Sequence, residues 1–113
     1  GNLTTAKGKN AIATGYLSTA DSTNSTAFGD STLSKGLNST TFGHKTFADG
    51  SQSIAGGTLS NARAINSFAF GNKATANKSG AFATGIENTT NAVAGFTNGF
   101  QNNVEGSYSA AFG

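Results

Sequence analysis

Glycine recurs at every fourteenth position of this chain. It occupies positions 1, 15, 29, 43, 57, 71, 85, 99 and 113 of the 113 residues, which include 16 glycines in all. Glycines placed at random would not fill one column nine times out of nine. The chain therefore consists of eight repeats of fourteen residues followed by the glycine of a ninth. A fixed short period is typical of solenoid proteins, in which each repeat forms one coil.

Three positions of the repeat accept only small or compact side chains. We count positions from the glycine as position 1, and call the residues that share a position a column. Columns 6, 11 and 13 hold alanine, serine, threonine, glycine or valine in every repeat. Large side chains are excluded where backbones approach closely or where an interior is narrow. These columns are therefore predicted to lie at such places.

Columns 12 and 14 carry most of the apolar bulk, including seven of the nine phenylalanines. Residues two apart point to the same face of a strand, so each repeat adds a large group to one continuous face, which we expect to be buried. The repeat with both Phe68 and Phe70 directly follows the repeat with Gly56, as close packing between stacked layers would require. The structural residues predicted for this face are Phe28, Phe42, Phe68, Phe70, Phe82 and Phe96.

The local sequence predicts a coil of strand, turn, strand and turn. Positions 10–14 alternate in size like a short strand, and asparagine at position 10 tolerates turn conformations. Glycine at position 8 and at position 1 is expected to supply the bends; the position-1 glycines predicted to be structural are Gly15, Gly29, Gly43, Gly57, Gly71, Gly85 and Gly99. Two strands of about five residues and two short turns fit a flattened two-sided roll. Eight coils stacked about 4.8 Å apart would form a rod roughly 38 Å long.

Column 7 alternates in charge through the first five repeats. It reads Lys7, Asp21, Lys35, Asp49 and Arg63. Such a column is either a ligand-binding stripe or a solvent-facing ladder that favours the correct register of the coils. Alternating signs cancel any field that a ligand could follow, so we favour the ladder.

A long apolar face on so thin a roll predicts self-association. Left uncovered, it would promote aggregation, and closed cyclic symmetry is the usual solution. The residues themselves are compatible with either a dimer or a trimer.

Composition argues against several other functions. The formal charge is +2 and 11% of residues are charged, which gives no basic patch for nucleic acid. Cysteine is absent, no run of 18 apolar residues could span a membrane, and the acids are too scattered to bind calcium. His44 is the only histidine, and no base stands beside a nucleophile at a repeated spacing. We expect no enzymatic activity, catalytic residue, metal or cofactor.

The aligned repeat, Asn-Ser-(Thr/Phe/Ile)-Ala-Phe-Gly, resembles the head repeat of YadA-like trimeric autotransporter adhesins of Gram-negative bacteria. That family's motif is Asn-Ser-Val-Ala-Ile-Gly followed by a small residue three places on. The best matches are Asn24–Gly29, Asn38–Gly43, Asn66–Gly71 and Ser109–Gly113. Departures are phenylalanine for valine or isoleucine, Gln52 for asparagine, and degenerate repeats around Ala81–Gly85 and Ala92–Gly99, where a regular coil is less strongly expected.

The resemblance implies an all-β fold, a left-handed parallel β-roll of about eight coils that assembles as a homotrimer. It implies that residues 1–113 are one head domain of a longer protein at the bacterial surface, held by a stalk and an outer-membrane anchor that this sequence lacks. It also implies a role in virulence through cell adhesion. Such heads bind extracellular-matrix proteins or cell-surface ligands and promote autoagglutination, through a diffuse repeated surface for which we name no binding residues.

The sequence is also compatible with two other functions. The head could be a structural spacer that carries other binding domains. It could also be an ice-binding solenoid, since column 4 begins with a ladder of Thr4, Ser18, Thr32, Thr46 and Ser60. That ladder decays further along the chain, whereas an ice-binding face must be flat and regular.

Overall fold

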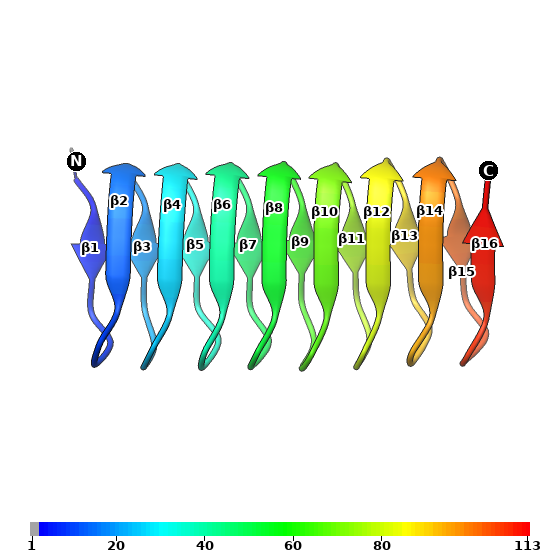
Figure 1. Cartoon of the computed structure of the whole chain (residues 1–113), viewed down its shortest axis with the longest axis horizontal. Helices are drawn as coiled ribbons and strands as arrows, with labels where there is room; N and C mark the ends of the chain where they lie inside the picture. Colours follow the sequence, from blue (N-terminus) through cyan, green and yellow to red (C-terminus); the bar gives the residue numbers. More distant parts are fainter. Residues whose placement is uncertain (1–2) are drawn as a thin grey trace.

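The computed structural model describes residues 3–113, so Gly1, the first of the glycine column, lies outside the described residues. The chain winds into a two-sided roll of stacked coils, and every coil contributes one short and one long strand (Figure 1). The short strands are β1 (Thr5–Ala6), β3 (Thr19–Ala20), β5 (Leu33–Ser34), β7 (Phe47–Ala48), β9 (Asn61–Ala62), β11 (Thr75–Ala76), β13 (Thr89–Thr90) and β15 (Asn103–Val104). The long strands are β2 (Ile12–Tyr16), β4 (Thr26–Asp30), β6 (Thr40–His44), β8 (Ile54–Thr58), β10 (Phe68–Asn72), β12 (Phe82–Ile86), β14 (Phe96–Phe100) and β16 (Ala110–Phe112).

The short strands form one parallel eight-stranded sheet and the long strands form the other. Each residue pairs with the residue fourteen positions on, as in Ile12↔Thr26. In Figure 1 the near strands run upward, the fainter strands behind them run downward, and the chain advances from left to right, so the winding is left-handed. The roll extends 39 Å along its longest principal axis and 11 Å along its shortest. The predicted flattened roll and its length are confirmed.

Two details of the predicted coil are wrong. The coil has one strand of five residues and one of two, instead of two of about five. The long strand also begins at position 12 and runs through the glycine at position 1, so this glycine lies within a strand and makes no bend. The degenerate repeats, in contrast, form regular coils, since β12 pairs along its whole length with β10 and β14.

Close stacking of the coils explains the glycine column. From Gly15 to Gly113 these glycines have φ between 98° and 144°, a region that L side chains rarely adopt. A Cβ added at Gly57 would also lie only 2.1 Å from the carbonyl oxygen of Gly71 in the next coil. Both the conformation and the contact therefore require glycine.

The turns lie at column 3 and at columns 8–10, so the bend predicted at the glycines of column 8, such as Gly36 and Gly50, is confirmed. Residues other than glycine adopt positive φ at columns 3 and 10. Asn24, Asn38 and Asn66 have φ of 58–59°, as expected for asparagine at position 10. Column 3 also has positive φ, at residues such as Leu17 and Lys45. Leucine and lysine do not favour this conformation, so these residue types do not predict the turn. Hydrogen bonds between neighbouring coils stabilise the positive φ of both turns. The N–H of Lys45 donates to Asp30 O at 2.9 Å, and the N–H of Asn38 donates to Thr23 O at 3.1 Å.

The interior is lined by the small-residue columns. Ala27, Ala55, Ala69 and Ala83 are fully buried, as are the serines and threonines of columns 4, 6, 11 and 13 in the central coils. Several hydroxyl groups there donate to backbone carbonyls. Ser18 Oγ donates to Gly29 O at 2.7 Å, and Ser39 Oγ donates to Gly36 O at 2.6 Å. The prediction that these columns meet a narrow interior is confirmed.

Gly57→Ala is expected to destabilise the fold by about 2 kcal/mol, because the new methyl group meets a backbone carbonyl and the residue is held at positive φ. Thermal unfolding followed by circular dichroism measures the loss. Gly80→Ala is the matched control: Gly80 also has positive φ, but its nearest contact would be 3.7 Å away, and Ala94 already adopts this conformation in the same column. Equal effects of the two substitutions would contradict the role of stacking.

Ala69→Phe is expected to lower the free energy of unfolding by about 3 kcal/mol, because a fully buried alanine leaves no room for a ring. Ala110→Phe tests the same change on the outer side of the long-strand sheet. Ala110 is exposed and pairs with Phe96, so this variant should keep its stability. Denaturant unfolding distinguishes the two sites, and a stable Ala69→Phe variant would place column 13 at the surface.

Candidate functional site

The outer side of the long-strand sheet is an apolar face. Columns 13 and 1 point into the roll, so columns 12, 14 and 2 point out. We call this outer side the aromatic face. Several large apolar residues of this face are between 40 and 70% exposed, namely Ile12, Tyr16, Phe28, Phe70, Ile86, Phe100 and Phe112.

Phenylalanine rings stack along the aromatic face because their strands are in register. The rings of Phe68 and Phe82 lie 4.5 Å apart and those of Phe82 and Phe96 lie 4.7 Å apart, each pair tilted by only 6°. This separation matches the spacing of neighbouring strands. Phe82 lies between the other two rings, and all three phenylalanines are only partly exposed.

Gly56 makes room for the rings on either side of it. Phe42 and Phe70 meet across this glycine with their centroids 5.3 Å apart. A Cβ on Gly56 would lie 2.7 Å from Phe42 Cε2 and 2.8 Å from Phe70 Cε2. The predicted exchange of volume between neighbouring coils is confirmed.

The predicted burial of the aromatic face does not occur within the single roll. The small-residue columns fill the interior, so the phenylalanines lie outside it with 40% or more of Phe28 and Phe70 exposed. Burial of this face requires contact with another molecule. Its cover by identical copies stays a prediction.

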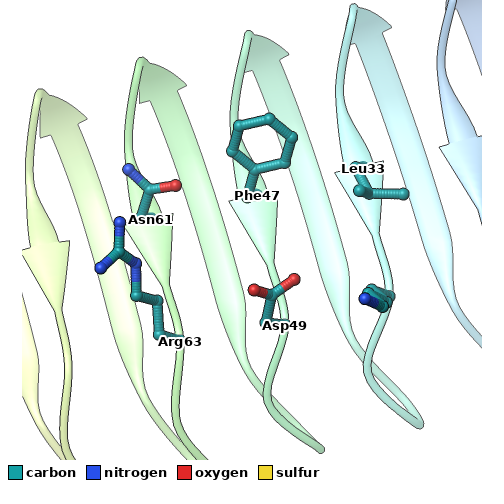
Figure 2. Close-up of a pocket in the computed structure, with 6 residues that line it drawn as sticks. Leu33, Phe47, Asp49, Asn61 and Arg63 are labelled. Carbon is teal, nitrogen blue, oxygen red and sulfur yellow. The ribbon is translucent and has the colours of Figure 1, made fainter.

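The outer side of the short-strand sheet has a different character. Columns 5 and 7 project from it, and an open hollow of about 390 Å³ lies across β5, β7 and β9. Figure 2 shows side chains of three successive coils around this hollow. Its lining residues are Leu33, Lys35, Phe47, Asp49, Asn61 and Arg63.

Column 7 forms a ladder only in part. Lys7 Nζ lies 3.6 Å from Asp21 Oδ1, the one ion pair within 4 Å among residues 3–113. Beyond the charged stretch the ladder continues through amides, since Asn77 Nδ2 donates to Asn91 Oδ1 at 2.6 Å and Asn91 Nδ2 donates to Glu105 Oε2 at 2.8 Å. The alternating charges at the hollow stay apart, so the predicted ladder of opposite charges does not extend through the middle coils.

The structure rules out an ice-binding role for column 4. Ser18, Thr32, Thr46 and Ser60 are buried inside the roll, with no more than 1% of each residue exposed. A ladder in the interior cannot contact ice. This alternative is therefore wrong.

No cluster of three His, Cys, Asp or Glu side chains that could hold a metal ion occurs within residues 3–113. His44 is exposed at the end of β6. The described part of the chain also has no helix long and apolar enough to cross a membrane.

Comparison with known families agrees with the geometry. The family described as the YadA head domain repeat (2 copies) matches residues 6–32, 34–60 and 62–87, which together make up more than half of the chain. The chain belongs to the YadA head family. Each match covers close to two coils. No curated protein matches the chain.

Heads of the YadA family are adhesin-type domains of surface-exposed trimeric autotransporters. In this YadA head the predicted structural glycines lie within the long strands and the predicted phenylalanines lie on the aromatic face. The hollow on the short-strand sheet was missed from the sequence. A signal for it exists, because Phe47 is one of only two phenylalanines outside columns 12 and 14.

Proposed function

We propose that this YadA head mediates multivalent attachment of a bacterium to extracellular-matrix proteins, host cells or other surfaces, and that it supports autoagglutination. Membership of an adhesin head family carries this proposal. The arrangement of the roll supports it, because one outer side is apolar and the other is polar. The first is suited to assembly and the second to contact with ligands.

Homotrimerisation through the aromatic face is the assembly that we propose. Adhesins of this family form homotrimers, and the aromatic face runs along a rod 39 Å long. Soluble monomers rarely leave apolar patches of this extent uncovered. Three rolls that turn this face toward a common axis bury it and present three short-strand sheets outward.

Multivalency would supply affinity without a strong individual site. Linking copies of a weak site raises avidity by about 10²–10⁴ when the copies engage together. Both the repeated coils and the three chains provide such copies. The alternative function is a spacer that carries other binding domains, for which a regular rod is also suited.

Phe70→Asp should disrupt the trimer, because assembly would then bury an unpaired carboxylate. The single roll should tolerate this change, since Phe70 is 40% exposed there. Light scattering should give three times the 11.2 kDa of one chain for the unaltered protein and a lower mass for the variant. Thr75→Asp places the same charge on the opposite sheet and should keep the trimer mass. An unchanged mass and melting temperature in Phe70→Asp would contradict assembly through this face.

Attachment is tested with the unaltered head on immobilised collagen, fibronectin and laminin and on cultured cells. We expect binding that weakens by about 10²-fold or more in the dissociated Phe70→Asp variant. Surface plasmon resonance measures the matrix proteins and flow cytometry measures the cells. A trimeric head that binds none of them would favour the spacer.

A further inference from the structure

The hollow on the short-strand sheet has an aromatic ring at its centre. Phe47 is 39% exposed, and column 5 otherwise holds threonine, asparagine or leucine. The residues that pair with Phe47 in the neighbouring coils are Leu33 and Asn61. Figure 2 shows the ring standing between these two side chains, above the carboxylate of Asp49. A flat apolar surface therefore borders polar groups within one open hollow.

The polar groups of the hollow make no side-chain hydrogen bond or ion pair within residues 3–113. This holds for Lys35, Asp49, Asn61 and Arg63. Elsewhere column 7 is paired, as in Lys7 with Asp21 at 3.6 Å. At the hollow, carboxylate, amide and guanidinium groups lie beside the ring with their hydrogen-bonding capacity available. Figure 2 shows Arg63 reaching along its coil toward Asn61.

We propose that this hollow binds a pyranose unit of a glycan. A sugar ring presents C–H groups on its faces and hydroxyl groups around its rim. The ring of Phe47 packs against the C–H face, Asp49 accepts hydrogen bonds from hydroxyl groups, and Asn61 and Arg63 donate to sugar oxygens. The two cations Lys35 and Arg63 outnumber the one carboxylate, Asp49, so the hollow has a net positive charge and favours acidic sugars over basic ones.

Other ligand classes fit the hollow less well. An extended peptide that adds a strand needs a free sheet edge, but β5, β7 and β9 are paired on both sides. A nucleic acid or free phosphate needs concentrated positive charge, whereas Asp49 stands between Lys35 and Arg63 in the same column. A ligand that has both an apolar face and a rim of hydroxyl groups uses all of these side chains.

This inference rests on the proposed attachment function and names a ligand class for it. Glycans decorate cell surfaces and extracellular-matrix glycoproteins. Three copies of the hollow would face outward in the proposed trimer, so a weak site in each chain would contribute to a multivalent contact.

The test uses lactose, chitobiose and sialyllactose as free probes with the whole chain. Saturation-transfer NMR should show contact between the protein and the C–H protons of at least one of them. Phe47→Thr should weaken this binding by about tenfold or more, because the stacking surface is lost. The variant should fold, since threonine occupies column 5 at Thr5, Thr19, Thr75 and Thr89. Ile65→Thr is the matched control, because it removes an exposed apolar side chain outside the hollow and should leave binding unchanged.

Asp49→Asn is paired with Asp21→Asn, which removes the same charge from the same column away from the hollow. We expect about tenfold weaker sugar binding for the first and no change for the second. If none of the three probes receives saturation from the protein, or if Phe47→Thr binds as well as the unaltered head, the glycan site is overturned.

The two proposals fail separately. Attachment to matrix or cells that persists in Phe47→Thr, with no saturation transfer from the unaltered head to any probe, overturns the glycan site and leaves attachment standing. Sugar binding by a trimer that attaches to no matrix protein or cell overturns the attachment proposal and leaves the site standing.

Discussion

The coils stack closely, and the backbone of each coil hydrogen-bonds to that of the next in a register of fourteen residues. This spacing limits the size of the side chain that each column can hold. Glycine fills column 1 because any side chain there would meet the carbonyl of the next coil, as Gly57 would meet Gly71 O. The same ladder holds the two turns of every coil at positive φ, through bonds such as that from Lys45 N to Asp30 O. Backbone hydrogen bonding between coils therefore determines which side chains each column accepts.

A thin interior is the direct consequence. With 11 Å along its shortest axis, the roll encloses alanine, serine and threonine, and its large apolar residues lie outside. Burial of a few methyl groups per coil contributes little hydrophobic stabilisation compared with a core of leucine and phenylalanine. The aromatic face supplies the missing apolar area, but it does so only when another molecule covers it. Fold stability and assembly are for this reason linked in our proposal.

The polar side of the roll depends on contacts between neighbouring coils that the sequence does not specify. The alternation of charge in column 7 was evident from the sequence, and its pairing at Lys7 and Asp21 is real. The sequence could not show that the side chains of Asp49 and Arg63 stay apart. Their separation depends on the direction in which each long side chain extends over the neighbouring coil. Phe47 was visible as an outlier in column 5, yet its partners at the hollow come from three coils and are brought together only by the stacking.

The sequence by itself determined the period, the solenoid class, the narrow interior and the side of the strand that carries the phenylalanines. Each of these features follows from the size of the side chains in one column. The repeat shows that size eight times, once in every coil. The tertiary structure decided that the glycine lies within a strand, that Leu17 and Lys45 adopt positive φ, and that the aromatic face is exposed on a single roll. Those features depend on backbone dihedral angles and on contacts between neighbouring coils, which the size of a side chain does not specify.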